Sequence, residues 1–89
     1  MFSILIHRKA LKETNGFPTE DKRRILSAIR QIATEPFSGD VKPIKGVKGL
    51  LRRRVGDYRI AFTVNFEKSE VVVLRVGRRG KFYQEQPQT

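Results

Sequence analysis

Arginine dominates the part of this chain that could do chemistry, which runs from residue 50 to residue 83. Basic side chains stand there within segments that otherwise have the composition of β-strands: Arg52, Arg53, Arg54, Arg59, Arg75, Arg78, Arg79 and Lys81. A guanidinium group offers a planar fork of donors that matches the oxygens of a phosphate. A sheet surface that bears several of them predicts a phosphate-rich partner such as nucleic acid.

The chain as a whole is strongly basic. Its 89 residues include 19 Lys and Arg against 9 Asp and Glu, which gives a formal net charge of +10. The excess is concentrated in residues 45–89, which hold 11 basic and 4 acidic side chains. Such a charge favours a polyanionic partner but says little about the fold. A merely solvated basic surface is the alternative, and clustering of the charge on one sheet argues against it.

Length and composition exclude several classes of protein. The chain suffices for one domain with a single small core, which we expect to span residues 1–84, with residues 85–89 as a polar tail. It has no cysteine and one histidine, so we expect neither disulfides nor a metal site, and no cofactor. We recognise neither a signal peptide nor a membrane span, which predicts a soluble cytoplasmic protein without membrane contact.

The N-terminal half is predicted to supply a strand and two helices. Residues 2–6 are typical of a strand, and residues 8–15 of a short helix that Gly16 closes in the left-handed conformation. A second helix begins at Pro18, which is tolerated in a first turn, and Thr19, which can cap it. Its apolar residues recur at three- and four-residue steps: Ile25, Leu26, Ala28, Ile29, Ile32 and Ala33. Such a stripe needs a sheet to cover it.

The C-terminal half is predicted to supply most of that sheet. Residues 37–49 are rich in glycine and lysine and favour a mostly irregular connection. Residues 50–55, 58–64 and 71–76 have the composition of three consecutive strands joined by hairpin turns, which makes them antiparallel. The predicted architecture is therefore α+β: a small antiparallel sheet with the two N-terminal helices packed on one face.

The turn at Gly56-Asp57 predicts where the arginines of the first hairpin point. With glycine at the first central position of a type II′ turn, Arg54 pairs with Arg59 and Arg52 with Ala61. Side chains alternate along a strand and direct partners share a face, so the three arginines project together. The opposite, core-facing side carries Val55, Tyr58, Ile60, Phe62 and Val64.

The same alternation extends the cluster to the third strand. It turns Val72, Leu74 and Val76 into the core. Arg75, and further on Arg79, then lie on the open face. Facing like charges repel by about 0.2–1 kcal/mol per pair, a cost that becomes a gain when phosphate lies between the guanidinium groups. Arg53 has the parity of the core side, so we expect it to reach the sheet edge or to pair with an acid such as Asp40.

Several short motifs are spaced along the chain: Lys45-Gly46, Leu51 to Arg54, Val55 to Ile60, Val71 to Gly77 and Arg78-Arg79, with Tyr83 shortly after. Their combination resembles the RelE toxins of the RelE/ParE superfamily of toxin-antitoxin modules, over nearly the full chain. The resemblance implies an endoribonuclease that enters the ribosomal A site and cuts messenger RNA during translation. It also implies a cognate antitoxin, which holds the toxin inactive in a hetero-oligomer.

The resemblance also implies which residues act. RelE-like enzymes use basic residues on a strand, the arginine of a Tyr-Arg turn, an arginine after a Val-Gly element and a tyrosine near the C-terminus. The corresponding catalytic residues are Arg52, Arg54, Arg59, Arg79 and Tyr83. Further RNA-binding residues are expected at Lys45, Lys48, Arg75, Arg78 and Lys81. Arginine is effectively always protonated, so it stabilises phosphate charge and leaves proton transfer to Tyr83, Lys81 or the ribosome-bound RNA itself.

Two other functions would use the same residues differently. A ParE-like toxin would inhibit DNA gyrase without cutting RNA, because that branch of the superfamily shares the fold. A basic RNA-binding module would have neither catalysis nor toxicity. The complete basic set together with Tyr83 favours the ribonuclease interpretation.

Overall fold

A computed structural model describes residues 1–78 of the chain. The predictions made for Arg79, Lys81, Tyr83 and the tail at 85–89 lie outside the described residues. The elements follow one another as β1 (Ser3–Ile6), α1 (Arg8–Asn15), α2 (Thr19–Thr34), β2 (Val41–Pro43), β3 (Leu51–Val55), β4 (Tyr58–Asn65) and β5 (Glu70–Arg78). Neither of these helices has the length and apolar character that a membrane span requires.

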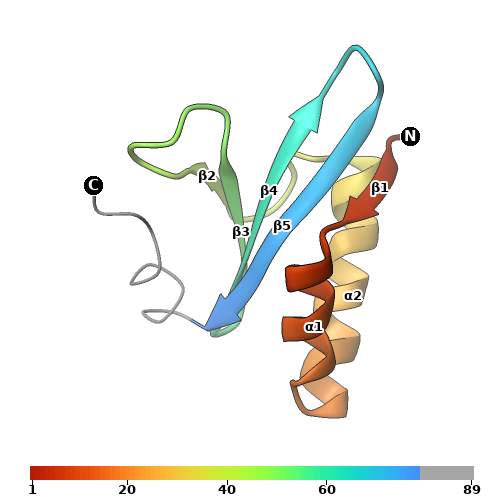
Figure 1. Cartoon of the computed structure of the whole chain (residues 1–89), viewed down its shortest axis with the longest axis vertical. Coiled ribbons are helices and arrows are strands. Elements are labelled where there is room, and N and C mark those ends of the chain that lie inside the picture. The colour runs from red at the N-terminus through yellow and green to blue at the C-terminus, as the bar shows by residue number, and fades with distance from the viewer. Residues whose placement is uncertain (79–89) are drawn as a thin grey trace.

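The strands form one sheet in the order β1-β5-β4-β3-β2 (Figure 1). Neighbours are antiparallel except at the edge, where β1 runs parallel to β5. The predicted α+β architecture is confirmed. The connection predicted to be mostly irregular contains β2, which pairs with β3 through Val41 and Arg53. Three residues that end in Pro43 carry too little strand pattern to be recognised.

Helix α2 covers one face of the sheet and forms the core with it (Figure 1). Its buried side chains are Ile25, Ala28, Ile29, Ile32 and Ala33. They meet Tyr58, Ile60, Phe62, Val71, Val73 and Val76 from the sheet. Full burial of one aliphatic side chain contributes about 1.5–3 kcal/mol, so this single layer is the main source of hydrophobic stabilisation.

The helix ends differ from the sequence predictions in two details. Gly16 ends α1 with φ −86°, in the right-handed rather than the left-handed region, and its N–H donates to the carbonyl of Glu13. Thr19 does not cap α2, because it is already helical; Pro18 holds the N-cap position without a side-chain hydrogen bond. The connection between the helices is short. Gly16 keeps the right-handed backbone conformation of α1, and Pro18 has an extended one, with ψ 150°.

A β-bulge in β5 changes which of its residues face the core. Between the pairs Ala61–Arg75 and Phe62–Val73, Leu74 is left as an extra residue. The fully buried side chains of β5 are Val71, Val73 and Val76, in place of the predicted Val72, Leu74 and Val76. One inserted residue reverses the parity of every position before it. Arg75 follows the bulge and keeps its predicted side.

A buried tyrosine ties β4 to the start of α2. The Tyr58 side chain is 4% exposed, its ring lies 4.6 Å from that of Phe17, and its hydroxyl donates to Asp21 Oδ2 at 2.7 Å. A hydrogen bond of this kind to a charged group contributes about 1.5–3 kcal/mol. The same hydrogen bond, together with burial, raises the pKa of Tyr58 above its ordinary value of 10.0.

We expect this raised pKa to appear as a loss of stability in alkali. The folded chain holds the proton more tightly than the unfolded chain, so the Tyr58 contribution is complete below pH 10.0 and declines as the pH rises through the raised pKa. Tyr83→Phe leaves Tyr58 as the one tyrosine, because the chain has two. Its tyrosinate absorbance should then show a midpoint above 10.0, and Asp21→Asn should lower that midpoint. A midpoint at or below 10.0 contradicts the assignment.

Candidate nucleic-acid interface

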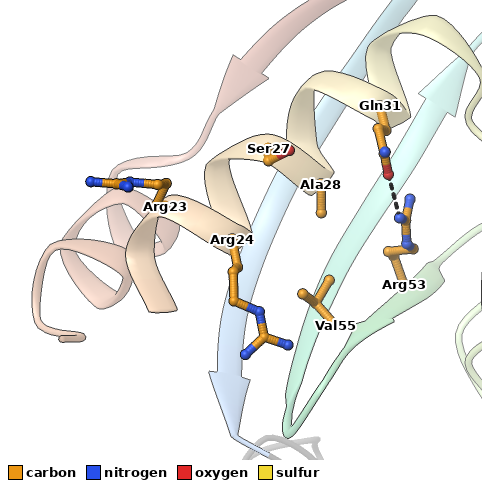
Figure 2. Close-up of a pocket in the computed structure, with 7 residues that line it drawn as sticks. All are labelled: Arg23, Arg24, Ser27, Ala28, Gln31, Arg53 and Val55. Carbon is orange, nitrogen blue, oxygen red and sulfur yellow. Dashed lines mark hydrogen bonds between the residues drawn. The ribbon is translucent and has the colours of Figure 1, made fainter. Parts of the chain in front are cut away.

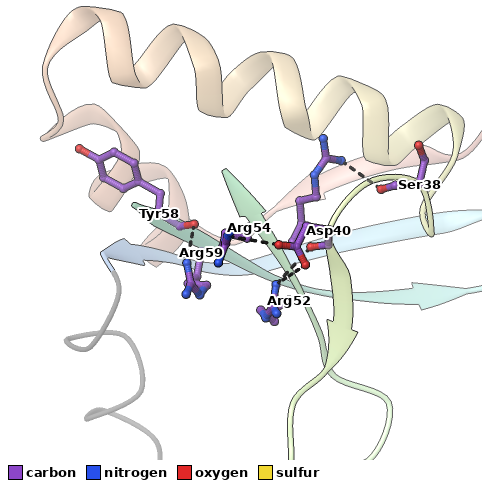
Figure 3. Close-up of polar contacts among 7 residues, drawn as sticks. Ser38, Asp40, Arg52, Arg54, Tyr58 and Arg59 are labelled. Carbon is purple, nitrogen blue, oxygen red and sulfur yellow. Dashed lines mark hydrogen bonds and ion pairs between the residues drawn. The ribbon is translucent and has the colours of Figure 1, made fainter. Parts of the chain in front are cut away.

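The face of the sheet turned away from α2, called the open face below, carries arginines from β3, β4 and β5. Arg54 pairs with Arg59 and Arg52 with Ala61, which confirms the predicted hairpin register. Gly56 has φ +59°, the left-handed conformation that favours glycine in this turn. Arg52, Arg54 and Arg59 thus lie together on the open face (Figure 3).

One carboxylate bridges two of these arginines. Asp40 Oδ1 lies 3.1 Å from Arg52 Nη1, and its Oδ2 lies 3.2 Å from Arg54 Nε (Figure 3). The Asp40 carbonyl also accepts hydrogen bonds from Arg52 Nη1 and from the Arg54 N–H. Asp40 therefore offsets the repulsion between two neighbouring cations and holds both side chains in place.

Of the two alternatives expected for Arg53, the sheet edge or an acid such as Asp40, the pairing with Asp40 is not found, because Asp40 pairs with Arg52 and Arg54. Arg53 lies on the opposite face from Arg52 and Arg54, where Asp40 cannot reach it. Its guanidinium instead donates to Gln31 Oε1 at 2.6 Å and to the Ser38 carbonyl at 3.5 Å. Alternation along β3 decides which arginine meets the acid, and it separates Arg53 from the open-face cluster.

Asp40 is ionised at neutral pH. The hydrogen bond from Arg52 and the positive charges of Arg52, Arg54 and Lys42 hold the pKa of this carboxyl below its ordinary value of 3.8. A carboxylate with so low a pKa is a weak base, so Asp40 positions the arginines rather than removing a proton.

Arg59 stands apart from the other two because it has no acidic partner within residues 1–78. The residue is only 7% exposed, and its Nε is a buried donor without a hydrogen-bond partner. Its Nη1 makes one long contact of 3.4 Å to the carbonyl of Tyr58. Its direct partner on β5 is Gly77, which has no side chain. An incoming phosphate would satisfy the unused donor.

Arg75 shares the open face by register but is bound at the sheet edge. Its Nε and Nη2 donate to Glu13 Oε2 at 3.0 and 2.7 Å. The other oxygen of Glu13 accepts from the Val76 N–H at 2.8 Å. Glu13 thereby connects α1 to the part of β5 that extends beyond its pairing with β1. The ion pair between Arg75 and Glu13 stabilises the fold.

The other basic residues expected at the interface and lying within residues 1–78 are apart from the cluster. Arg78 stacks on the Tyr58 ring, with its Cζ 5.4 Å from the ring centroid, on the helix side of the sheet end. Lys45 and Lys48 are exposed on the loop between β2 and β3. Arg79, Lys81 and Tyr83 lie outside the described residues.

Sequence reasoning missed Lys42 on the open face and considered Asp40 only as a partner of Arg53. Lys42 on β2 pairs with Arg52 and so lies on the same face, and Asp40 just before it carries the bridging carboxylate. The signal was the alternation Val41-Lys42-Pro43, which is too short to stand out. Beyond them, a small apolar cluster of Ile44, Leu50, Ala61 and Leu74 covers the far end of the open face.

The described residues offer no ready metal site on this face. No three His, Asp or Glu side chains of residues 1–78 come together as the ligands of a metal would. The cations of the open face can bind phosphate and stabilise negative charge.

Comparisons with known proteins place the chain among toxins. Residues 4–83 match a family model described as the ParE toxin of the type II toxin-antitoxin system, parDE. A Methanocaldococcus jannaschii protein named as toxin RelE1 is 25% identical over 85 residues, which covers 92% of this chain and 94% of that protein. A chain of the archaeal RelE-RelB complex from Pyrococcus horikoshii is 28% identical, with a TM-score of 0.76 and coverage of 90% and 97%. The isolated E. coli RelE toxin has the same fold, with 20% identity, a TM-score of 0.75 and coverage of 96% and 94%.

The Asp40 bridge makes a prediction about both stability and anion binding. Asp40→Asn should lower the free energy of unfolding at neutral pH and strengthen binding of a single-stranded RNA oligonucleotide by about a few-fold, because it frees two guanidinium groups. The stability difference should persist at every pH above 3.8 and disappear as the pH falls through the lowered pKa of Asp40, where the native carboxyl is also neutral.

Chemical denaturation across this pH range and fluorescence anisotropy measure the two effects. Glu67→Gln, on the turn after β4, is the control that removes one exposed carboxylate elsewhere. Equal RNA affinities for Asp40→Asn and Glu67→Gln would show that only net charge matters, against a specific role of Asp40.

Proposed function

This chain belongs to the ParE toxin family, and so to the RelE/ParE superfamily, of type II toxin-antitoxin systems, and from that membership we propose a ribosome-dependent endoribonuclease that cuts messenger RNA in the A site. The observation that carries the proposal is the Arg59 guanidinium, which is buried on the open face with a donor left unused. Relatives named RelE support the RNA-cutting branch.

The proposed reaction needs only proton transfer and charge stabilisation. The 2′-hydroxyl attacks the neighbouring phosphorus, so that a P–O2′ bond forms and the P–O5′ bond breaks. The 2′-hydroxyl proton passes to a base, and the departing 5′-oxygen takes a proton from an acid. The products are a 2′,3′-cyclic phosphate and a 5′-hydroxyl. The phosphorane carries extra negative charge, which fixed cations stabilise most effectively where water is excluded.

The open-face residues divide this work among themselves. We assign Arg59 to the scissile phosphate, because its register puts it on the open face with Arg54 and its Nε has no hydrogen-bond partner within residues 1–78. Arg52 and Arg54, held in place by Asp40, stabilise the phosphorane and the flanking backbone. By family resemblance, Arg79 contributes a second contact to the phosphate.

Proton transfer falls to residues outside the described part of the chain. The resemblance assigns it to Tyr83, with Lys81 as the other titratable candidate. A tyrosine or lysine among several arginines has a lowered pKa and so can act as a base near neutral pH. We assign Lys45 and Lys48, which are exposed on the loop between β2 and β3, to RNA backbone beyond the cleavage point.

The partners follow from the toxin class. The Pyrococcus horikoshii relative forms a complex of RelE with RelB, which supports a cognate antitoxin bound to this chain in a hetero-oligomer. The ribosome and its messenger RNA are the proposed targets, in the cytoplasm where translation takes place. An antitoxin that covers the open face would exclude RNA from Arg59.

A second candidate function is inhibition of DNA gyrase. The family model that matches residues 4–83 is named for ParE, and fold alone does not separate the two activities. A gyrase inhibitor would need no unused guanidinium on a sheet face, so the geometry of Arg59 favours RNA cleavage.

Primer extension on a translated message with purified ribosomes tests the proposal. We expect codon-spaced cuts with 5′-hydroxyl ends. Arg59→Lys keeps the charge but loses the planar fork, and should lower the single-turnover rate about 10²- to 10³-fold. Arg79→Ala and Tyr83→Phe should also reduce cleavage. Lys68→Gln, which removes one positive charge from the exposed turn between β4 and β5, should cut at the native rate.

Circular dichroism of each variant separates lost chemistry from lost folding. Cleavage products that end in 5′-phosphate contradict the 2′-hydroxyl mechanism. Growth arrest with intact message and cleaved DNA would instead identify the gyrase-directed activity.

A further inference from the structure

A second cationic surface lies on the other side of the sheet, in a groove between α2 and β3. This α2–β3 groove has a volume of about 390 Å³. Polar side chains line it, namely Arg23, Arg24, Ser27, Gln31 and Arg53, over a floor of Ala28 and Val55 (Figure 2). The sheet separates it from the open face, so the proposed catalytic site does not include it.

The positive charge of this groove is not neutralised. Within residues 1–78 the ion pairs involve Arg52, Arg54 and Arg75, and none reaches an arginine of the groove. Arg53 is held by neutral acceptors, the side-chain oxygen of Gln31 and the Ser38 carbonyl. No carboxylate lines the groove. On the open face, by contrast, the Asp40 carboxylate forms ion pairs with Arg52 and Arg54.

Two guanidinium groups stand at opposite ends of the groove. Arg24 reaches from α2 toward the β3–β4 turn, where a Cβ built on Gly56 would come within 2.8 Å of its Nη2. Arg53 projects from β3 toward Gln31, and Val55 lies between the two arginines (Figure 2). The Arg23 guanidinium points away from Val55 in the same view. Arg24 and Arg53 start from regular elements, so their separation is set by the fold rather than by a loop.

The residue types favour nucleic acid over an acidic protein. Contacts to a phosphate backbone come from arginine and from neutral donors such as serine and glutamine, which is the set found here. Protein interfaces instead centre on large apolar or aromatic anchors. The exposed large side chains of that kind, Leu5, Phe37 and Phe66 among them, lie outside the groove.

We infer that the α2–β3 groove binds phosphates of an RNA backbone, with Arg24 and Arg53 as the charged contacts and Ser27 as a neutral donor. The inference builds on the proposed function, because it gives the toxin RNA on both sides of its sheet. Messenger RNA would meet the open face while a second RNA segment, of the kind that a ribosome presents, lies along α2. In this arrangement the groove determines where the toxin binds on the ribosome, and the open face cleaves the messenger RNA there.

The test measures binding to an RNA that cannot be cut. A fluorescein-labelled RNA hairpin with 2′-O-methyl groups throughout has no 2′-hydroxyl to attack, so its affinity reports contacts alone. Arg24→Gln should weaken binding about tenfold and reduce the slope of log K against log salt by about one, the signature of one lost phosphate contact. Lys68→Gln is the charge-matched control and should retain the native slope.

Gln31→Glu tests the groove without removing an arginine. The new carboxylate gives Arg53 an acidic partner and repels phosphate, so affinity for the hairpin should fall while the thermal midpoint stays the same or rises. Native affinity and salt slope in both Arg24→Gln and Gln31→Glu overturn the inference. The inference is also overturned if these two variants lose binding to poly-L-glutamate but keep native binding to the hairpin, since that result would assign the groove to an acidic protein. Failure to cleave message would overturn the proposed function and leave this binding result standing.

Discussion

Repulsion between arginines on adjacent strands is the constraint that the rest of this structure accommodates. Arg54 and Arg59 are direct partners across the hairpin, an arrangement that costs about 0.2–1 kcal/mol for facing like charges. Asp40 offsets the repulsion on one side by bridging Arg52 and Arg54. Arg59 has no such partner within the described residues. The apolar layer between the sheet and α2 supplies the stability that allows this charged face to persist.

The described arginines of the sheet and of α2 fall into groups that the fold keeps apart. Arg52, Arg54 and Arg59 share the open face, where we propose that they bind phosphate. Arg75 and Arg78 are engaged by Glu13 and Tyr58 and fasten the C-terminal end of β5 to the helices and to β4. Arg24 and Arg53 border the groove on the helix side. The basic side chains thus supply anchoring contacts and two separate cationic surfaces, which we propose bind anions.

The open-face cluster could be predicted because its determinants are local. A glycine at the first position of a two-residue turn sets the register, and alternation then decides the facing of Arg52, Arg54 and Arg59. The bulge at Leu74 could not be predicted in the same way. Residues 71–74 are all apolar, so either parity buries hydrophobic surface, and only contact with α2 selects one. The partner of Asp40 depended on a three-residue strand that the pattern did not reveal.

Charge, composition and turn geometry were enough, without coordinates, to determine a basic α+β domain with three arginines on one sheet face, since these properties depend on neighbours along the chain. The tertiary structure alone decided which polar side chains pair with one another. Glu13 binds Arg75 across 62 residues, Asp21 accepts from Tyr58 across 37, and Arg53 reaches Gln31 on α2. Such contacts exist only once the helices are packed, because side chains that are distant in sequence come within hydrogen-bond reach only through the layered core. The unused donor of Arg59 and the unneutralised groove beside α2 are consequences of that packing.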